Sequence, residues 1–124
     1  MLIITRYIAR HELAPLKRYL GLAEVVAGAK KVLKGLATET KPLRSLAGFR
    51  FYKVRLSGKQ SARMVVFVLV ENNKVVPLII RLKKDKLFGQ NMIMNDPALV
   101  KQMNINLDQV LKDIEQNQYE EIFI

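Results

Sequence analysis

The chain has 124 residues, the size of one domain, and half of them are hydrophobic, which allows a core without covalent staples. It has no cysteine and its longest apolar run has seven residues, so disulfides, thiolate metal sites and a membrane helix of about 20 residues are excluded. A net charge of +10 favours a polyanionic partner, because clustered cations repel one another. Since Arg6 interrupts the first apolar residues too early for a secretory signal, we expect a soluble, cytoplasmic protein.

The first part of the chain predicts one strand and two helices. Residues Leu2 to Ile8 are mostly β-branched, aromatic or aliphatic, which is typical of a strand. Pro15 fits only the first turn of a helix, which we place from about Ala14 to just before Gly21. A second helix is predicted from about Leu22 to Leu36, because apolar residues recur there at intervals of three and four.

Three antiparallel strands are predicted next, at Phe49 to Leu56, Arg63 to Val70 and Val75 to Leu82. The Asn-Asn pair at 72 and 73 predicts a two-residue hairpin turn. That turn would set Arg63 opposite Leu82 and put Lys84 on the same face of the sheet as Arg63. Pro77 has no N–H for a strand ladder, so the third strand should have a free edge or a bulge there.

The end of the chain differs from the rest in charge. Residues 95–124 carry two cations and six acids, whereas residues 1–94 have a net charge of +14. Pro97, after Asn95 or Asp96, predicts a capped helix start, and a last helix is predicted from about Asn106 to Asn117 before a short apolar end. We therefore expect a core at 1–94 and an acidic helical extension of the same domain at 95–124.

Cations gather on the predicted strands. Residues 40–70 include seven Lys or Arg residues and no acid. Alternation puts Lys53 and Arg55 side by side on one face of the first strand, while Val54 faces the core. The turn between the first and second strands has no readable register, so whether Arg63 shares the face of Lys53 stays open at this point.

Converging cations of this kind could bind a phosphodiester and stabilise the extra charge of its transition state. Arg supplies fixed forks for phosphate oxygens, and the lowered pKa of a crowded Lys lets it accept a proton. Such a face would allow RNA cleavage by the neighbouring 2′-OH without a metal or other cofactor. The residue types alone favour binding over cleavage, and strand cations can also serve only to deter edge pairing. His11 is the only histidine, so no metal site is predicted.

The order of one strand, two helices and three strands, with "PLRSLAGFRFYKVRL", "SARMVVFVLV" and "VVPLIIRLKKDK", resembles the RelE/ParE superfamily of type II toxins over about residues 2–93. The resemblance implies an α+β, RelE-like fold: two N-terminal helices packed on a small twisted antiparallel sheet, here with a C-terminal helical extension. For the RelE branch it implies ribosome-dependent cleavage of messenger RNA through 2′-OH attack on the adjacent phosphate. The ParE branch, which poisons DNA gyrase, usually lacks the catalytic cations, so their presence favours the RNA branch.

The resemblance also assigns roles to residues of this chain. Lys53 resembles a strand cation that helps to activate the 2′-OH, and Arg63 resembles the Arg that stabilises the transition state. Several active members place a Tyr after the last strand, whereas this chain has Phe88, which can stack on a base but cannot move a proton. The predicted catalytic set is Lys53, Arg55, Arg63 and Lys84, and the predicted RNA-binding set is Arg50, Lys59, Arg81, Lys83, Lys86 and Phe88.

Three functions stay open on these grounds. The first is a RelE-like endonuclease toxin, with messenger RNA and the ribosome as partners and an acidic, partly disordered antitoxin as inhibitor. The second is a non-catalytic nucleic-acid-binding module, and the third is a ParE-like gyrase inhibitor. The acidic last helix either lies over the basic face and competes with RNA, or caps the core or forms a dimer.

Overall fold

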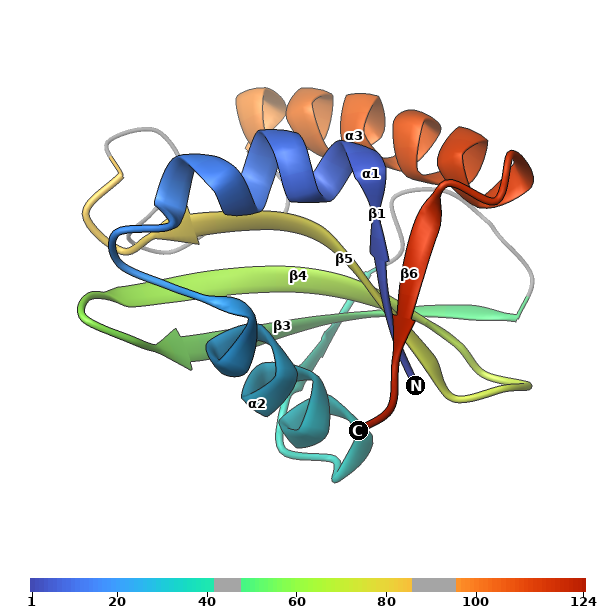
Figure 1. Ribbon diagram of the computed structural model, residues 1–124, viewed down its shortest axis with the longest axis horizontal. Helices are drawn as coiled ribbons and strands as arrows, with labels where there is room; N and C mark the ends of the chain where they lie inside the picture. Colours follow the sequence, from blue (N-terminus) through green and yellow to red (C-terminus); the bar gives the residue numbers. More distant parts are fainter. Residues whose placement is uncertain (42–47, 86–95) are drawn as a thin grey trace.

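The computed structural model describes residues 1–41, 48–85 and 96–124, which form one six-stranded mixed sheet with helices on both faces (Figure 1). The strands are β1 (Leu2–Thr5), β2 (Thr38–Thr40), β3 (Phe49–Ser57), β4 (Ser61–Leu69), β5 (Lys74–Leu82) and β6 (Tyr119–Ile122). The helical segments are α1 (Arg6–Ile8), η1 (Ala9–Leu13), η2 (Ala14–Leu16), α2 (Leu22–Leu33) and α3 (Pro97–Glu115). The strand order is β2-β3-β4-β5-β1-β6, with β1 parallel to β5 and all other neighbouring pairs antiparallel.

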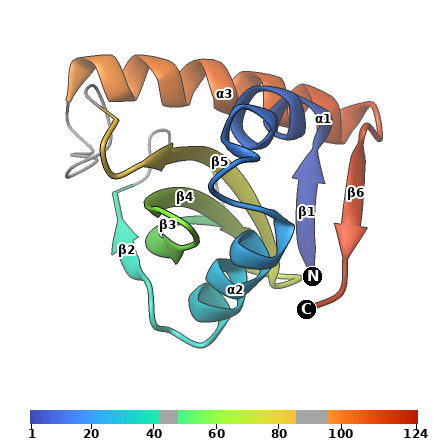
Figure 2. The ribbon, with the colours of Figure 1, turned by 60° about the vertical axis from the view of Figure 1, so that its left-hand side comes forward.

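Helices cover both faces of the sheet (Figure 2), and each face carries a separate apolar core. On one face the buried side of α2 packs against β3 and β4, and a Cβ at Gly28 would collide with Leu56, so glycine lets the helix lie close to the strands. On the other face α3 presents the stripe Leu99, Met103, Leu107 and Val110, which recurs every three or four residues. This stripe packs over Phe51, Val65, Phe67 and Ile79 of β3, β4 and β5. Strand alternation therefore sends odd residues of β3 toward α3 and even ones toward α2.

The predicted fold class is wrong. The protein does not pack two N-terminal helices on a small antiparallel sheet: the sheet is mixed and six-stranded, and the longest helix, α3, is near the C-terminus. Helix α1 and helix α2 lie on different parts of the sheet (Figure 2): α1 contacts α3 and β5, whereas α2 contacts mainly β3. The expected apolar tail forms the edge strand β6, which pairs with β1 from Leu2 opposite Ile122 to Thr5 opposite Tyr119. A parallel pair between β1 and β5 then completes the mixed sheet.

Several element bounds also differ from the sequence-based expectation. Helical structure begins at Arg6 rather than near Ala14, because the Thr5 side chain accepts a hydrogen bond from Ile8 N and ends β1 as a helix cap. Of the two alternatives for the cap before Pro97, Asn95 or Asp96, the second is confirmed, since Asp96 Oδ1 accepts from Ala98 N at 2.9 Å. The helix then continues unbroken to Glu115 instead of restarting near residue 106.

The hairpin between β4 and β5 corrects the predicted register. Leu69 pairs with Lys74, so the loop has four residues rather than two, and Asn73 takes a positive φ of 53°. The alternative of a bulge near Pro77 is confirmed: the register shifts between Val65 and Val66 on the partner strand, opposite Pro77 and Ile79. As a result Arg63 lies opposite Arg81, not opposite Leu82. Lys83, rather than Lys84, therefore continues the face of Arg63.

Candidate nucleic-acid interface

Arginines from three neighbouring strands stand side by side at one end of the sheet. Arg55 on β3 is directly opposite Arg63 on β4, and Arg63 is directly opposite Arg81 on β5. Directly opposed residues project from the same face with Cβ atoms about 4.5–5.5 Å apart, so the three side chains start from neighbouring positions on one face. The open question from the sequence is thereby answered, because Arg63 shares the face of Arg55 and hence of Lys53. We call Lys53, Arg55, Arg63 and Arg81 the cationic row.

The surroundings of Lys53 favour its neutral, deprotonated form. It pairs with Val65, next to the core under α3, and its side chain is half-buried. Burial lowers the pKa of Lys53 below its usual range, and the positive charge of Arg63 lowers it further. Neutral Lys53 is therefore populated at lower pH than an ordinary lysine, which is the property a proton acceptor needs.

A pocket lies at the outer end of the cationic row. Its volume is about 180 Å³, and its lining includes Arg55, Arg63 and Lys83 together with the hydroxyl-bearing residues Ser57 and Ser61. Lys83 reaches this place because its backbone N–H donates to Ser61 O at 2.8 Å, which extends the pairing of β4 and β5 beyond Leu82. Cations and hydroxyl groups around a small concave surface are suited to hold a phosphate.

Arg81 contacts a buried polar network that was not predicted from the sequence. Glu12 of η1 is 2% exposed, and its Oε2 atom lies 3.2 Å from Arg81 Nη1. Its Oε1 atom accepts a hydrogen bond from Ile80 N at 2.7 Å. Burial raises the pKa of Glu12, while the charge of Arg81 opposes that rise. The position of Glu12 one helical turn after buried Ile8 was the available clue that it faces inward.

Asn106 of α3 completes this network from the opposite side. Its Nδ2 group donates to Leu78 O at 2.8 Å and points at Glu12 Oε2 at 3.4 Å. Its Oδ1 atom accepts from Tyr7 Oη and from Gln102 Nε2. Glu12 and Asn106 thus bond backbone groups on both sides of Ile79, at the bulge where strand pairing is irregular.

The remaining predicted site residues lie elsewhere. Lys84 Nζ is 5.0 Å from the centre of the Tyr19 ring, and Tyr19 packs with the core on the α2 side. Arg50 pairs with Val68, which also belongs to that core, so Arg50 is on the face opposite Lys53. Lys59 is exposed in the turn between β3 and β4. Lys86 and Phe88 fall outside the described residues.

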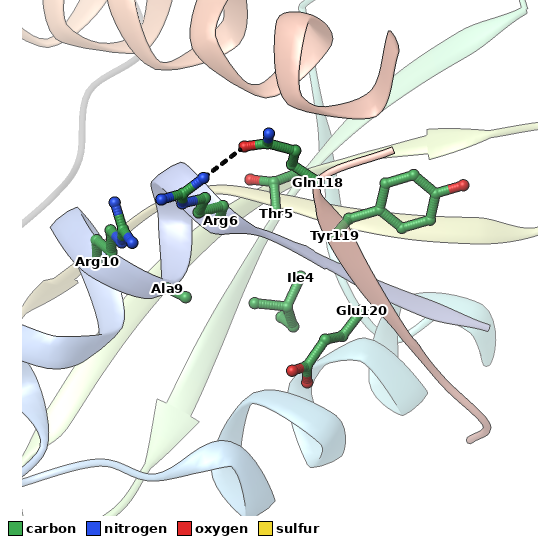
Figure 3. A pocket seen from close by; sticks show the side chains of 8 residues that line it. All are labelled: Ile4, Thr5, Arg6, Ala9, Arg10, Gln118, Tyr119 and Glu120. Atoms are coloured by element: carbon green, nitrogen blue, oxygen red, sulfur yellow. Dashed lines mark hydrogen bonds between the residues drawn. The ribbon is translucent and has the colours of Figure 1, made fainter. Parts of the chain in front are cut away.

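A second hollow lies away from the cationic row, between α1, β1 and the edge strand β6 (Figure 3). Its volume is about 410 Å³ and Ile4 and Ala9 supply apolar surface. Arg6 lines one wall and its Nη1 donates to Gln118 Oε1 at 2.9 Å, as the dashed line in Figure 3 shows. Glu120 lies on the opposite side of the hollow from Arg6 and Arg10 (Figure 3). The mixed charge makes this hollow a poorer site for a polyanion than the cationic row.

In the part of the chain that the structure describes, no three His, Asp or Glu side chains gather as metal ligands would. Over the same residues, no helix has the length and apolar character needed to cross a bilayer. No family model, no curated protein and no solved structure matches the chain.

Proposed function

We propose that the protein binds single-stranded RNA on the cationic row and cleaves it by attack of a ribose 2′-OH on the adjacent phosphate. One observation carries the proposal: Arg55, Arg63 and Arg81 are in direct cross-strand register, and Lys53 is on their face. Cations gathered on one sheet face attract a polyanion, and the guanidinium forks of Arg55 and Arg63 suit phosphate oxygens. Phosphate contacts of this kind would supply most of the affinity.

The proposed chemical step uses the same four side chains. Neutral Lys53 takes the proton of the 2′-OH, the 2′-oxygen forms a bond to phosphorus, and the bond from phosphorus to the 5′-oxygen breaks. The leaving 5′-oxygen takes a proton from water, the hydroxide so formed takes the proton back from Lys53, and a 2′,3′-cyclic phosphate stays on the upstream fragment. The guanidinium groups of Arg55 and Arg63 hold the phosphate oxygens and stabilise the charge that grows on them. The lowered pKa of Lys53 supports its assignment as base.

In a cell, the proposed RNA cleavage would make the protein a toxin. The sequence resemblance to the RelE branch supports messenger RNA on the ribosome as the substrate, with Lys53 and Arg63 in the family's catalytic positions. An acidic antitoxin that covers the cationic row is then the expected inhibitor. Because the fold differs from the one that the resemblance implies, the toxin role depends on the cations and their spacing alone.

A non-catalytic RNA-binding module is the second candidate. The observation in its favour is that three of the four members of the cationic row are arginines, which do not accept protons at neutral pH. Only Lys53 within the row can act as a base, so both candidates predict the same binding face and differ in the effect of Lys53.

Expression in cells followed by mapping of transcript ends tests the proposal. We expect new ends inside translated codons with the wild-type chain, and none with Lys53→Gln or Arg63→Gln. Lys31→Gln on the exposed side of α2 makes the same charge change outside the row and should leave the cuts in place. Loss of cuts in Lys53→Gln with unchanged RNA affinity supports the enzyme, and RNA binding without cuts supports the module. DNA damage with intact transcripts would instead indicate a gyrase inhibitor.

A further inference from the structure

The Arg81 end of the cationic row differs from the Arg55 end in having a buried acid beside it. Arg55 is exposed, whereas the Arg81 side chain is 22% exposed and is paired with Glu12. Glu12 comes from η1, and Arg81 comes from β5, 69 positions later in the chain. The contact therefore joins the helical layer to the strand that ends the row.

Both carboxylate oxygens of Glu12 are fixed by groups from different elements. Oε1 accepts from Ile80 N at 2.7 Å, and Oε2 faces Arg81 at 3.2 Å and Asn106 Nδ2 at 3.4 Å. An oxygen held from β5 and α3 at once has little freedom to move, so it restrains the Arg81 guanidinium. Such restraint is what a binding group needs if it is to meet a phosphate without first being ordered.

The negative charge of Glu12 is not required by the backbone groups around it. A glutamine carbonyl oxygen could accept from Ile80 N equally well, and it would avoid the cost of burying a charge. Burial raises the pKa of Glu12, which is the direction expected when desolvation of the charge dominates. The group that does require a carboxylate is the guanidinium of Arg81.

We infer that Glu12 is a positioning residue for RNA binding: it holds the Arg81 guanidinium in line with Arg63 and Arg55, so that the three meet one RNA backbone. The inference rests on the proposed function, because it concerns the same row of cations. Glu12 itself does not touch the RNA. A guanidinium has five N–H groups, so it can bond a carboxylate on one edge and a phosphate on another.

The test compares the affinity of Glu12→Gln and wild-type protein for a fluorescent single-stranded RNA of about 12 nucleotides. Loss of one phosphate contact should lower the slope of log K against log salt by about 0.7, which is about a fivefold loss of affinity at 0.1 M salt. Removal of a nearby negative charge without any positioning effect would have the opposite sign and tighten binding. Folding is followed in the same samples by circular dichroism.

A double-mutant cycle and a spectroscopic measurement separate positioning from a general structural effect. If Glu12 acts through Arg81, then Glu12→Gln causes no further loss in an Arg81→Gln background. The side-chain Nε resonance of Arg81, assigned by its absence in Arg81→Gln, should move toward that of exposed Arg10 in Glu12→Gln. If Glu12→Gln does not fold, Arg81→Lys serves instead, because Lys cannot bond carboxylate and phosphate with one fork. It should lose about fivefold, with Arg55→Lys losing much less.

The outcomes distinguish this inference from the proposed function. Weaker binding with a lower salt slope and no additivity supports the positioning role. Tighter or unchanged binding in Glu12→Gln, when Arg55→Gln and Arg63→Gln both weaken it, overturns the inference and leaves the proposed function standing. Equal losses in Arg81→Lys and Arg55→Lys overturn it as well. Unchanged binding in all of these variants overturns the proposed function itself.

Discussion

The two ends of one sheet face have opposite chemistry on the same strands. On β3, Phe51 is fully buried under the α3 side while Arg55, four positions later, is exposed. On β4 a similar change separates fully buried Phe67 from half-buried Arg63. At about 3.4 Å per residue, the two ends are about 14 Å apart. We call them the apolar end and the cationic end.

The apolar end supplies the stability and the fixed strand register that the cationic end lacks. Stacking of Phe67 on Phe49, with ring centres 5.0 Å apart, and burial under α3 hold β3 and β4 in a fixed register. Because the strands continue unbroken, the same register fixes the spacing of Arg55 and Arg63. The cations themselves repel one another and cannot specify that spacing. The stability of the apolar end therefore offsets the cost of assembling the cationic end.

The largest effect should come from the apolar end. Phe67→Ala removes a fully buried ring and should lower the free energy of unfolding by about 3–5 kcal/mol, because the cavity left behind cannot be filled. Urea unfolding followed by circular dichroism measures this. Phe123→Ala is the matched control, since Phe123 is 89% exposed, and should change stability by less than about 0.5 kcal/mol. Equal stabilities of the two variants would contradict the packing described for α3.

The boundary between the two ends should show the next largest effect. Asn106→Ala leaves Leu78 O without its donor and removes a contact with Glu12, so we expect a loss of about 2 kcal/mol. Gln109→Ala, on the exposed side of the same helix, controls for helix propensity. Urea unfolding of the two variants gives the difference. A loss no larger than that of Gln109→Ala would show that the bulge does not depend on Asn106.

The pH dependence of stability tests the charge of Glu12. Its pKa is raised on folding, so the folded chain binds this proton more tightly than the unfolded chain. Stability relative to Glu12→Gln should therefore be highest below the ordinary pKa of a glutamate, about 4.3, and should fall as pH rises through the raised pKa. Urea unfolding of both proteins at several pH values between 4 and 8 measures this difference. A difference that rises with pH would show that the Arg81 pair outweighs burial.

The sequence predicted much of the strand region and little of what surrounds it. Alternation correctly put Val54 in a core and Lys53 on the other face, and Pro77 indicated the bulge. The consequence of the bulge was not predictable, because the direction in which an extra residue shifts the register depends on tertiary contacts such as Asn106 with Leu78. That one shift replaced Lys84 by Lys83 on the cationic face.

Contacts between distant segments account for the other failures. β6 has four residues, two of them Glu, and its pairing with β1 joins the two ends of the chain, so local propensity gave no reason to expect a strand. The pair of Glu12 and Arg81 was likewise not predictable, because the local clue indicates only that Glu12 faces inward and not which residue it meets. The predicted fold class was wrong because the mixed six-stranded sheet depends on long-range strand pairs such as that of β1 with β6.

The smallest expected effect is the one that most sharply separates the two ends. Arg55 is exposed and directly opposite Arg63, so Arg55→Gln should relieve repulsion and raise the free energy of unfolding by a few tenths of a kcal/mol at low salt. The gain should vanish near 1 M salt, where charges are screened over about 3 Å.

The sign of this change in the free energy of unfolding is informative, because the same substitution should weaken RNA binding. Paired urea titrations at low and high salt measure the stability change, and Lys31→Gln is the control for a lost surface charge outside the row. A variant that gains stability while losing affinity identifies Arg55 as a residue kept for a ligand rather than for the fold. A loss of stability at low salt would instead mean that Arg55 stabilises the cationic end, and that end would then need no polyanion to explain it.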